Sequence, residues 1–159
     1  MIFIQKLNEK IIDEITDSFN DIDYANLASW LEAYKSIETK PFHLLGHFLK
    51  ISWVNPNSAK MFLETNNSNR YGNAHGGALY TLADVVIAED ILHRLEDKRD
   101  VFTLELKMNY IRKVNGNYVI GKSEILHLGS RTAVAECSIY NEDNELVAKA
   151  FGTFFIDFK

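Results

Sequence analysis

The chain is 159 residues long, which is enough for one domain with a single hydrophobic core. Hydrophobic residues make up 47% of it and only two residues are proline, a composition typical of a folded chain rather than a disordered one. The formal net charge of −5 argues against a nucleic-acid partner, because neutralising phosphates requires a basic surface.

Cysteine content and the N-terminal residues indicate the cellular setting. Cys137 is the single cysteine, so neither an internal disulfide nor a cysteine-based metal cluster is possible, and its apolar neighbours Ala135 and Ile139 predict a buried thiol. Residues 1–10 lack the apolar centre of a signal peptide, and no apolar run reaches membrane-spanning length. We therefore expect a cytoplasmic protein that does not insert into membranes.

The first 40 residues have the periodicity of two helices. Each segment places its apolar residues on one side: Ile4, Leu7, Ile11, Ile15 and Phe19 in the first, and Leu27, Trp30, Leu31 and Tyr34 in the second. Pro41 is predicted to end the second helix. The interpretation is a helical extension over residues 1–40, followed by a domain over residues 41–159.

From Gly46 onward the pattern favours strands interrupted by one long helix. Residues 46–54 and 59–64 are predicted strands around the turn at residues 55–57. A polar loop over residues 65–74 leads into a helix that runs to about Leu95. Four further strands are predicted over residues 101–111, 118–128, 132–140 and 146–155, joined by short turns. We expect an α+β fold in which a curled antiparallel sheet wraps around the apolar central helix.

The residues at the start of that helix are the candidates for a catalytic site. Asn69-Arg70-Tyr71-Gly72-Asn73-Ala74-His75-Gly76-Gly77 leads directly into an apolar segment over residues 78–88, in which Asp84 is the single charge. The first N–H groups of a helix have no intrahelical acceptor, so they suit a developing oxyanion, and an acid on the same side of the helix suits a water molecule. The alternative is structural: glycines that allow close packing, and an aspartate that accepts a structural hydrogen bond.

These residues resemble the hotdog-fold thioesterases, in particular the branch that includes the phenylacetate-degradation thioesterase and acyl-CoA thioesterase 13. The family pattern is an Asn, a Gly three residues later, His-Gly-Gly, and an Asp nine residues after that His; here these are Asn69, Gly72, His75-Gly76-Gly77 and Asp84. A Ser or Thr seven residues before an aromatic residue is matched by Thr103 and Tyr110. The resemblance covers roughly residues 41–155.

The resemblance implies a site shared by two subunits. The Gly76 N–H, with that of Gly77, would polarise the thioester carbonyl, and Asn69 would place the water or the thioester. Asp84 of the partner subunit would act as general base or as nucleophile, and Thr103 would hold the water or that carboxylate. His75 would shape the loop or bind the substrate.

Cations near predicted strand ends are candidates for binding the phosphates of coenzyme A (CoA). They are Arg112, Lys113 and Arg131, where solvated turn charges are the structural alternative. Lys113 stands where the family often has proline. The other histidines lack metal-ligand spacing, so no metal site is predicted.

The predicted function is hydrolysis of an acyl-CoA thioester by a homodimer or homotetramer, with no metal or redox cofactor. Two alternatives share the fold: a protein that binds acyl-CoA without catalysis, and a dehydratase or hydratase. The first would leave Asp84 without a purpose. The second typically pairs a histidine with an acid, and no histidine shares the Asp84 side of the helix.

Overall fold

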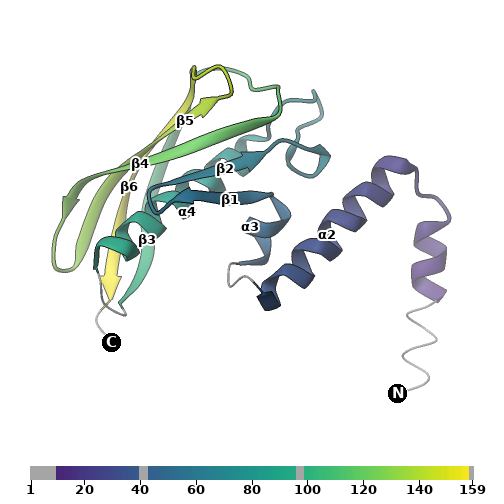
Figure 1. Ribbon diagram of the computed structural model, residues 1–159, viewed down its shortest axis with the longest axis horizontal. Coiled ribbons are helices and arrows are strands. Elements are labelled where there is room, and N and C mark those ends of the chain that lie inside the picture. Colours follow the sequence, from purple (N-terminus) through teal and green to yellow (C-terminus); the bar gives the residue numbers. More distant parts are fainter. Residues whose placement is uncertain (1–9, 40–42, 96–98, 158–159) are drawn as a thin grey trace.

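The computed structural model describes residues 10–39, 43–95 and 99–157 (Figure 1). Residues 10–16 are helical. The named helices are α2 (Asp21–Thr39), α3 (Leu44–Phe48), η1 (Thr65–Asn67, a 3₁₀ turn) and α4 (Gly76–Leu95). The strands are β1 (Ile51–Asn55), β2 (Ser58–Phe62), β3 (Asp100–Tyr110), β4 (Tyr118–Leu128), β5 (Thr132–Asn141) and β6 (Leu146–Asp157).

The body is a six-stranded sheet around α4. Its strand order is β1-β2-β4-β5-β6-β3, and every neighbouring pair is antiparallel. The helix contributes Leu82, Val86 and Ile91 to the core, and each of these side chains is fully buried. The sheet meets them with Ile139 and Phe154, which are equally buried. Because α4 is apolar around most of its circumference, it requires cover on several sides, and the curled sheet supplies it.

Strand β3 forms one edge of the sheet and leaves apolar side chains uncovered. Phe102 is 53% exposed and Leu104 is 61% exposed, although both belong to the apolar face that the alternation predicts. The register against β6 shifts between Thr103 and Glu105, which marks an irregularity in the strand at Leu104. An 11-residue edge with exposed apolar side chains is an association surface unless another chain covers it.

One sequence prediction about the fold is wrong. The segment predicted as a strand from Gly46 begins as helix α3, because the His43 side chain caps it by accepting a hydrogen bond from Gly46 N–H, and the strand begins only at Ile51. The strands on either side of residues 111–117 are not neighbours in the sheet, since β3 pairs with β6 and β4 pairs with β2 and β5.

The other predicted elements are confirmed. The second helix, the central helix ending at Leu95 and the four long strands all form within a few residues of their predicted bounds. The predicted helix over the first 19 residues lies partly outside the described residues, and so does Pro41. Within the described residues, no helix combines the length and apolarity needed to cross a membrane.

Candidate active site

The loop before α4 is held by the side chain of Asn69. Its Oδ1 accepts hydrogen bonds from the backbone N–H groups of Tyr71, at 2.9 Å, and Asn73, at 3.2 Å. Gly72 has a φ of 72°, a left-handed conformation that favours glycine. Asn69 Nδ2 makes a long contact of 3.5 Å with the Ala74 carbonyl oxygen. The loop is therefore a fixed turn that delivers the chain to the start of α4.

At the helix start, the structure leaves one backbone donor available. The His75 carbonyl accepts from the N–H groups of Ala78 and Leu79, and His75 Nδ1 accepts from Gly77 N–H at 3.0 Å. Nδ1 must be unprotonated to accept, so the proton of a neutral His75 lies on Nε2. Nothing in the described part of the chain accepts a hydrogen bond from Gly76 N–H, which therefore is the donor best suited to a substrate oxygen.

Tyr110, at the end of β3, packs against the same glycine. Its hydroxyl donates to the Gly76 carbonyl oxygen at 2.9 Å. A Cβ at Gly76 would lie 3.3 Å from the Tyr110 ring and hydroxyl, so the two residues are already in close contact. Burial, with a smaller effect of Tyr80, raises the pKa of Tyr110, so its hydroxyl keeps the proton that it donates. The tyrosine fixes the first turn of the helix against the sheet.

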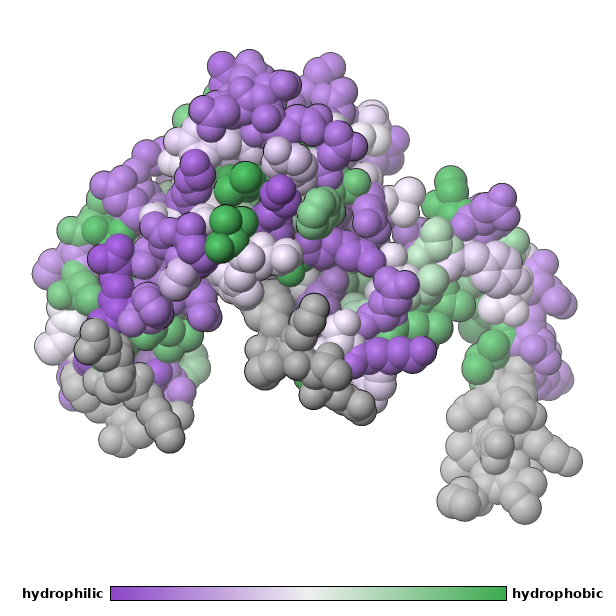
Figure 2. Space-filling view, in the orientation of Figure 1, coloured by the Kyte–Doolittle hydropathy of each residue, from purple (hydrophilic) through white to green (hydrophobic). Residues whose placement is uncertain are grey.

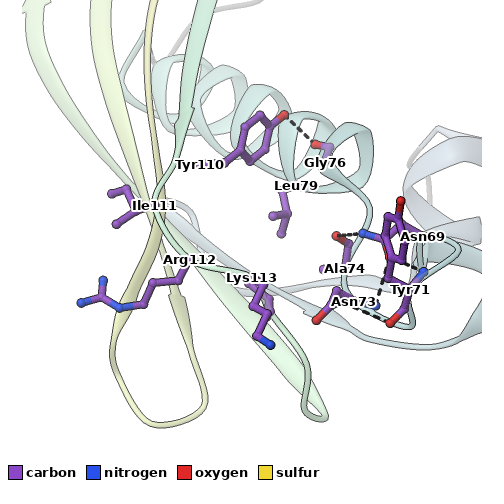
Figure 3. A pocket seen from close by; sticks show the side chains of 11 residues that line it. Asn69, Tyr71, Asn73, Ala74, Gly76, Leu79, Tyr110, Ile111, Arg112 and Lys113 are labelled. Carbon is purple, nitrogen blue, oxygen red and sulfur yellow. Dashed lines mark hydrogen bonds between the residues drawn. The ribbon is translucent and has the colours of Figure 1, made fainter.

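A cavity of about 430 Å³ opens beside Gly76 (Figure 3). Its walls come from the Asn69 loop, the first turn of α4 and the residues that follow β3; they are Asn69, Tyr71, Asn73, Ala74, Gly76, Leu79, Tyr110, Ile111, Arg112, Lys113 and Val114. The Arg112 side chain extends away from the loop, and its Nη1 donates to the Leu146 carbonyl oxygen at 2.6 Å. Lys113 brings a second positive charge to the same wall. This cavity suits an anionic group close to a backbone donor.

A second cavity, of about 350 Å³, lies beside Gly77. Leu45, Leu49 and Ala78 give it an apolar lining, and Thr81 lies on the helix wall with its hydroxyl bonded to the Gly77 carbonyl oxygen. The two glycines thus stand between a cavity that carries cations and one in which Leu45, Leu49 and Ala78 share the lining with polar side chains. An elongated ligand with an anionic end and an apolar end would fit across them.

Asp84 lies two turns further along α4 and is half-buried. Thr103 Oγ1 donates to its Oδ1 at 2.7 Å, and among the described residues this is the one hydrogen bond to the Asp84 carboxylate. The register shift of β3 begins at Thr103, so the strand irregularity aims this hydroxyl at the helix. No described residue donates a hydrogen bond to the second carboxylate oxygen, Oδ2.

The predicted residues form two groups within one chain. Gly76 and Asp84 are eight positions apart on α4, a rise of about 12 Å along the helix axis. Arg131 lies on the same side of the molecule as Asp84 and Thr103. Its carbonyl oxygen accepts a hydrogen bond from Ile156 N–H, and Ile156 pairs with Val101 near the start of β3. Asn69, Gly76, Arg112 and Lys113 therefore lie at one end, whereas Asp84, Thr103 and Arg131 lie towards the other. A single substrate carbonyl cannot contact both ends of the same chain.

Sequence reasoning assigned no role to the contact of Tyr110 with Gly76 or to the cavity wall from α3. The aromatic residue seven positions after Thr103 was the available signal for Tyr110, whereas nothing local indicates that Leu45 approaches α4. Among the described residues, no three His, Cys, Asp or Glu side chains group as a metal ion would require.

The architecture, a long apolar helix wrapped by an antiparallel sheet, is the hotdog fold. A Bacillus halodurans protein crystallised with CoA aligns at a TM-score of 0.84 over 94% of this chain and 99% of its own, with 22% identity. A conserved Pseudomonas aeruginosa protein aligns at a TM-score of 0.69 over 73% of this chain and 95% of its own, with 31% identity.

The model of the Thioesterase superfamily matches residues 71–148, which include Gly76, Asp84 and Thr103. The chain is 28% identical to the medium/long-chain acyl-CoA thioesterase YigI of Salmonella typhimurium, over 52% of this chain and 61% of that protein. It is 31% identical to the 1,4-dihydroxy-2-naphthoyl-CoA hydrolase of Escherichia coli, over 55% of this chain and 65% of that protein. The chain spans 56–65% of the length of the curated relatives it matches. The matched segment is 78 of the 159 residues, and over it the chain is similar to the Thioesterase superfamily.

Proposed function

We propose that the protein is an acyl-CoA thioesterase that hydrolyses its substrate at sites shared by two subunits. The observation that carries this proposal is the pair of separated groups on α4: a backbone donor at Gly76, and a carboxylate at Asp84 held by Thr103. The names of the relatives support the substrate class, since they act on acyl-CoA thioesters. Among the hotdog-fold thioesterases, we propose that the protein belongs to the branch that includes the phenylacetate-degradation thioesterase.

The proposed orientation follows from the two cavities. The phosphates of CoA bind beside Arg112 and Lys113, where positive charge is available, and Arg131 of the second subunit adds to it. The acyl group lies against Leu45 and Leu49 in the cavity next to Gly77. The thioester carbonyl then reaches Gly76 N–H between them.

In the proposed reaction, Asp84 of the partner removes a proton from water, and the resulting hydroxide attacks the thioester carbon. Gly76 N–H stabilises the oxyanion of the tetrahedral intermediate. The carbon–sulfur bond then breaks, the sulfur leaves as the CoA thiolate, and the proton from Asp84 returns to it. Thr103 occupies one carboxylate oxygen, which leaves the other for water, and this favours a general base over a nucleophile.

The second subunit is required because of the 12 Å spacing of the two groups along α4. The exposed edge of β3 is the proposed contact, since pairing two copies would cover Phe102 and Leu104. We propose a homodimer at minimum, with a homotetramer as the larger assembly.

A thiol-release assay over short, medium, long and aromatic acyl-CoAs tests the proposal. We expect release of CoA and free acid in equal amounts from at least one class. Tight binding with no release would indicate a non-catalytic acyl-CoA-binding protein, and hydration of an enoyl-CoA without CoA release would indicate a hydratase. A single turnover in ¹⁸O-water should place the label in the product acid; label found instead in Asp84 would indicate a nucleophile.

A further inference from the structure

Three hydrogen bonds join helix α4 to strand β3, at intervals of four residues along the helix. The pairs are the Tyr110 hydroxyl with the Gly76 carbonyl oxygen, the Tyr80 hydroxyl with the Leu106 carbonyl oxygen, and the Thr103 hydroxyl with the Asp84 carboxylate. Four residues are slightly more than one helical turn, so the three helix positions share one side of α4. That side is therefore bonded to β3 from the first residue of the helix as far as Asp84.

These bonds fix β3 against the helix in a way that apolar packing cannot. Among the described strands, β3 pairs with β6 alone, and apolar contacts with α4 are non-directional. Hydrophilic residues predominate on the face of the body shown in Figure 2, whereas these hydroxyl groups reach the mostly apolar helix that the sheet surrounds. The hydrogen bonds therefore set how α4 and β3 lie against each other.

The peptide groups on both sides of Gly76 are held in place. In the His75–Gly76 peptide, the carbonyl oxygen accepts from two N–H groups of the next turn. In the Gly76–Gly77 peptide, the carbonyl oxygen accepts from the Tyr110 hydroxyl at 2.9 Å, and the N–H donates to His75 Nδ1 at 3.0 Å (Figure 3). Because glycine has wide backbone freedom, these bonds decide where the remaining donor, Gly76 N–H, points.

The Tyr110 hydroxyl holds this turn and is not free to act on a substrate as an acid, because its proton is donated to the Gly76 carbonyl oxygen. Burial raises the pKa of Tyr110, and the nearby Tyr80 adds to this effect, so the hydroxyl stays protonated at neutral pH. In the described part of the chain, Tyr110 is also the one side chain of the sheet that bonds to the first turn of α4.

Tyr80 acts in the opposite direction, from the helix on the strand. Its hydroxyl donates to the carbonyl oxygen of Leu106, which lies on β3 between Tyr110 and Thr103. The register shift between Thr103 and Glu105 is next to this contact. Tyr80 therefore anchors β3 beside the irregularity that precedes it.

We propose that Tyr110 and Tyr80 are positioning residues of the thioester site. Tyr110 fixes the direction of Gly76 N–H, and Tyr80 keeps β3 in place between the points where Tyr110 and Thr103 meet the helix. A donor that is already oriented stabilises an oxyanion without reorganisation during the reaction. The inference rests on the proposed function, in which Gly76 N–H meets the oxyanion and Thr103 holds Asp84.

The test removes one hydroxyl at a time from the full chain, in Tyr110→Phe and Tyr80→Phe. The matched control is Tyr118→Phe, since the Tyr118 ring contacts Phe62 and Lys60 but its hydroxyl has no hydrogen-bond partner among the described residues. Tyr110→Phe should lower the turnover number about threefold to tenfold, as expected for one hydrogen bond, and leave KM unchanged. Tyr80→Phe should lower it less, and Tyr118→Phe should not change it.

Amide hydrogen exchange on ¹⁵N-glycine-labelled protein tests the same contact without turnover. The Gly77 N–H should exchange several-fold faster in Tyr110→Phe, because the peptide that it shares with Gly76 loses one of its anchors. The Gly121 N–H, in the middle of the sheet, should keep its exchange rate in all variants and so confirm that they fold.

Three outcomes would overturn the proposal: unchanged turnover with unchanged Gly77 exchange, a rise in KM alone, and a fall in turnover without faster exchange. The second would make Tyr110 a substrate contact, and the third would assign it to the chemistry itself. Failure of the unaltered protein to release CoA from any acyl-CoA would count against the proposed function. In that case Gly77 exchange alone decides whether Tyr110 holds the turn.

Discussion

Two positions on α4, Gly76 at its start and Asp84 two turns later, differ in what they offer a substrate. At its start, backbone geometry dominates. The loop is fixed, the Gly77 N–H donates to His75 Nδ1, and the Gly76 N–H has no acceptor among the described residues. Gly76 lines a cavity that also carries Arg112 and Lys113. Two turns later, side-chain chemistry dominates, in a carboxylate held by the Thr103 hydroxyl. In the proposed mechanism, one end stabilises negative charge and the other accepts a proton. Because both lie on one helix, the proposal requires the two ends to come from different subunits.

The largest effect is expected at the acidic end. Asp84→Asn keeps the shape and can still accept from Thr103, but the amide cannot take a proton from water. The turnover number should fall about 10²–10⁴-fold, the usual contribution of a positioned acid or base. Glu89→Gln, an exposed change on the same helix, is the control and should be neutral. Turnover near that of the unaltered protein would remove Asp84 from the mechanism.

At the donor end, Gly76→Val should act through crowding. The new side chain enters the space already filled by Tyr110, 3.3 Å from the position of the Cβ, while the N–H itself remains. Activity should drop on the order of 10²-fold, similar to the loss of an oxyanion donor. The activity of Gly76→Ala should lie between that of the unaltered protein and that of Gly76→Val. Far-UV circular dichroism should be unchanged in both variants. Unimpaired kinetics would assign the glycine to packing alone.

Thr103→Val isolates the hydrogen bond to the carboxylate. A hydrogen bond to a charged group contributes about 1.5 kcal/mol or more, which corresponds to roughly a tenfold fall in the turnover number. KM should change little, because the hydroxyl acts on Asp84 rather than on CoA. Thr103→Ser keeps the hydroxyl and should restore most of the activity. Failure of that rescue would mean that the methyl group, not the hydroxyl, matters here.

The smallest effect is expected in the hydrophobic core, at Cys137. Burial raises the pKa of its thiol to about 12, so at pH 8 only about one molecule in 10⁴ carries the reactive thiolate. The folded protein should not react with a thiol reagent, which therefore reports released CoA alone. Cys137→Ala should leave turnover unchanged. Rapid labelling of the native protein would show that the core opens on the timescale of the assay.

Local sequence patterns predicted the elements but not their neighbours. Strands β3–β6 follow from long alternations, and the bounds of α4 follow from the glycines at its start and the charged residues after Leu95. The sequence does not predict helix α3 because a five-residue segment is too short to show a period that separates helix from strand, and its cap at His43 decides the outcome. The pairing of β3 with β6 depends on long-range contacts, which no turn signal encodes.

The residues of the candidate site divide in the same way, into features encoded by local sequence and features that depend on long-range contacts. The spacing of Gly77 and Asp84 is local, so the sequence already placed both on one side of a helix. The contact of Tyr110 with Gly76 joins residues 34 positions apart, and the cavity wall from Leu45 depends on where α3 packs. Such contacts arise from tertiary packing, so no pattern within a single segment can predict them.

Subunit mixing tests the shared site most directly. Inactive Gly76→Val and inactive Asp84→Asn chains are combined and allowed to exchange, with exchange verified by co-purification of differently tagged chains. Each hybrid dimer then holds one intact site and one doubly damaged site. With random exchange, about a quarter of the activity of the unaltered protein should return. Verified exchange without any return of activity would contradict a site formed by Gly76 of one subunit and Asp84 of the other.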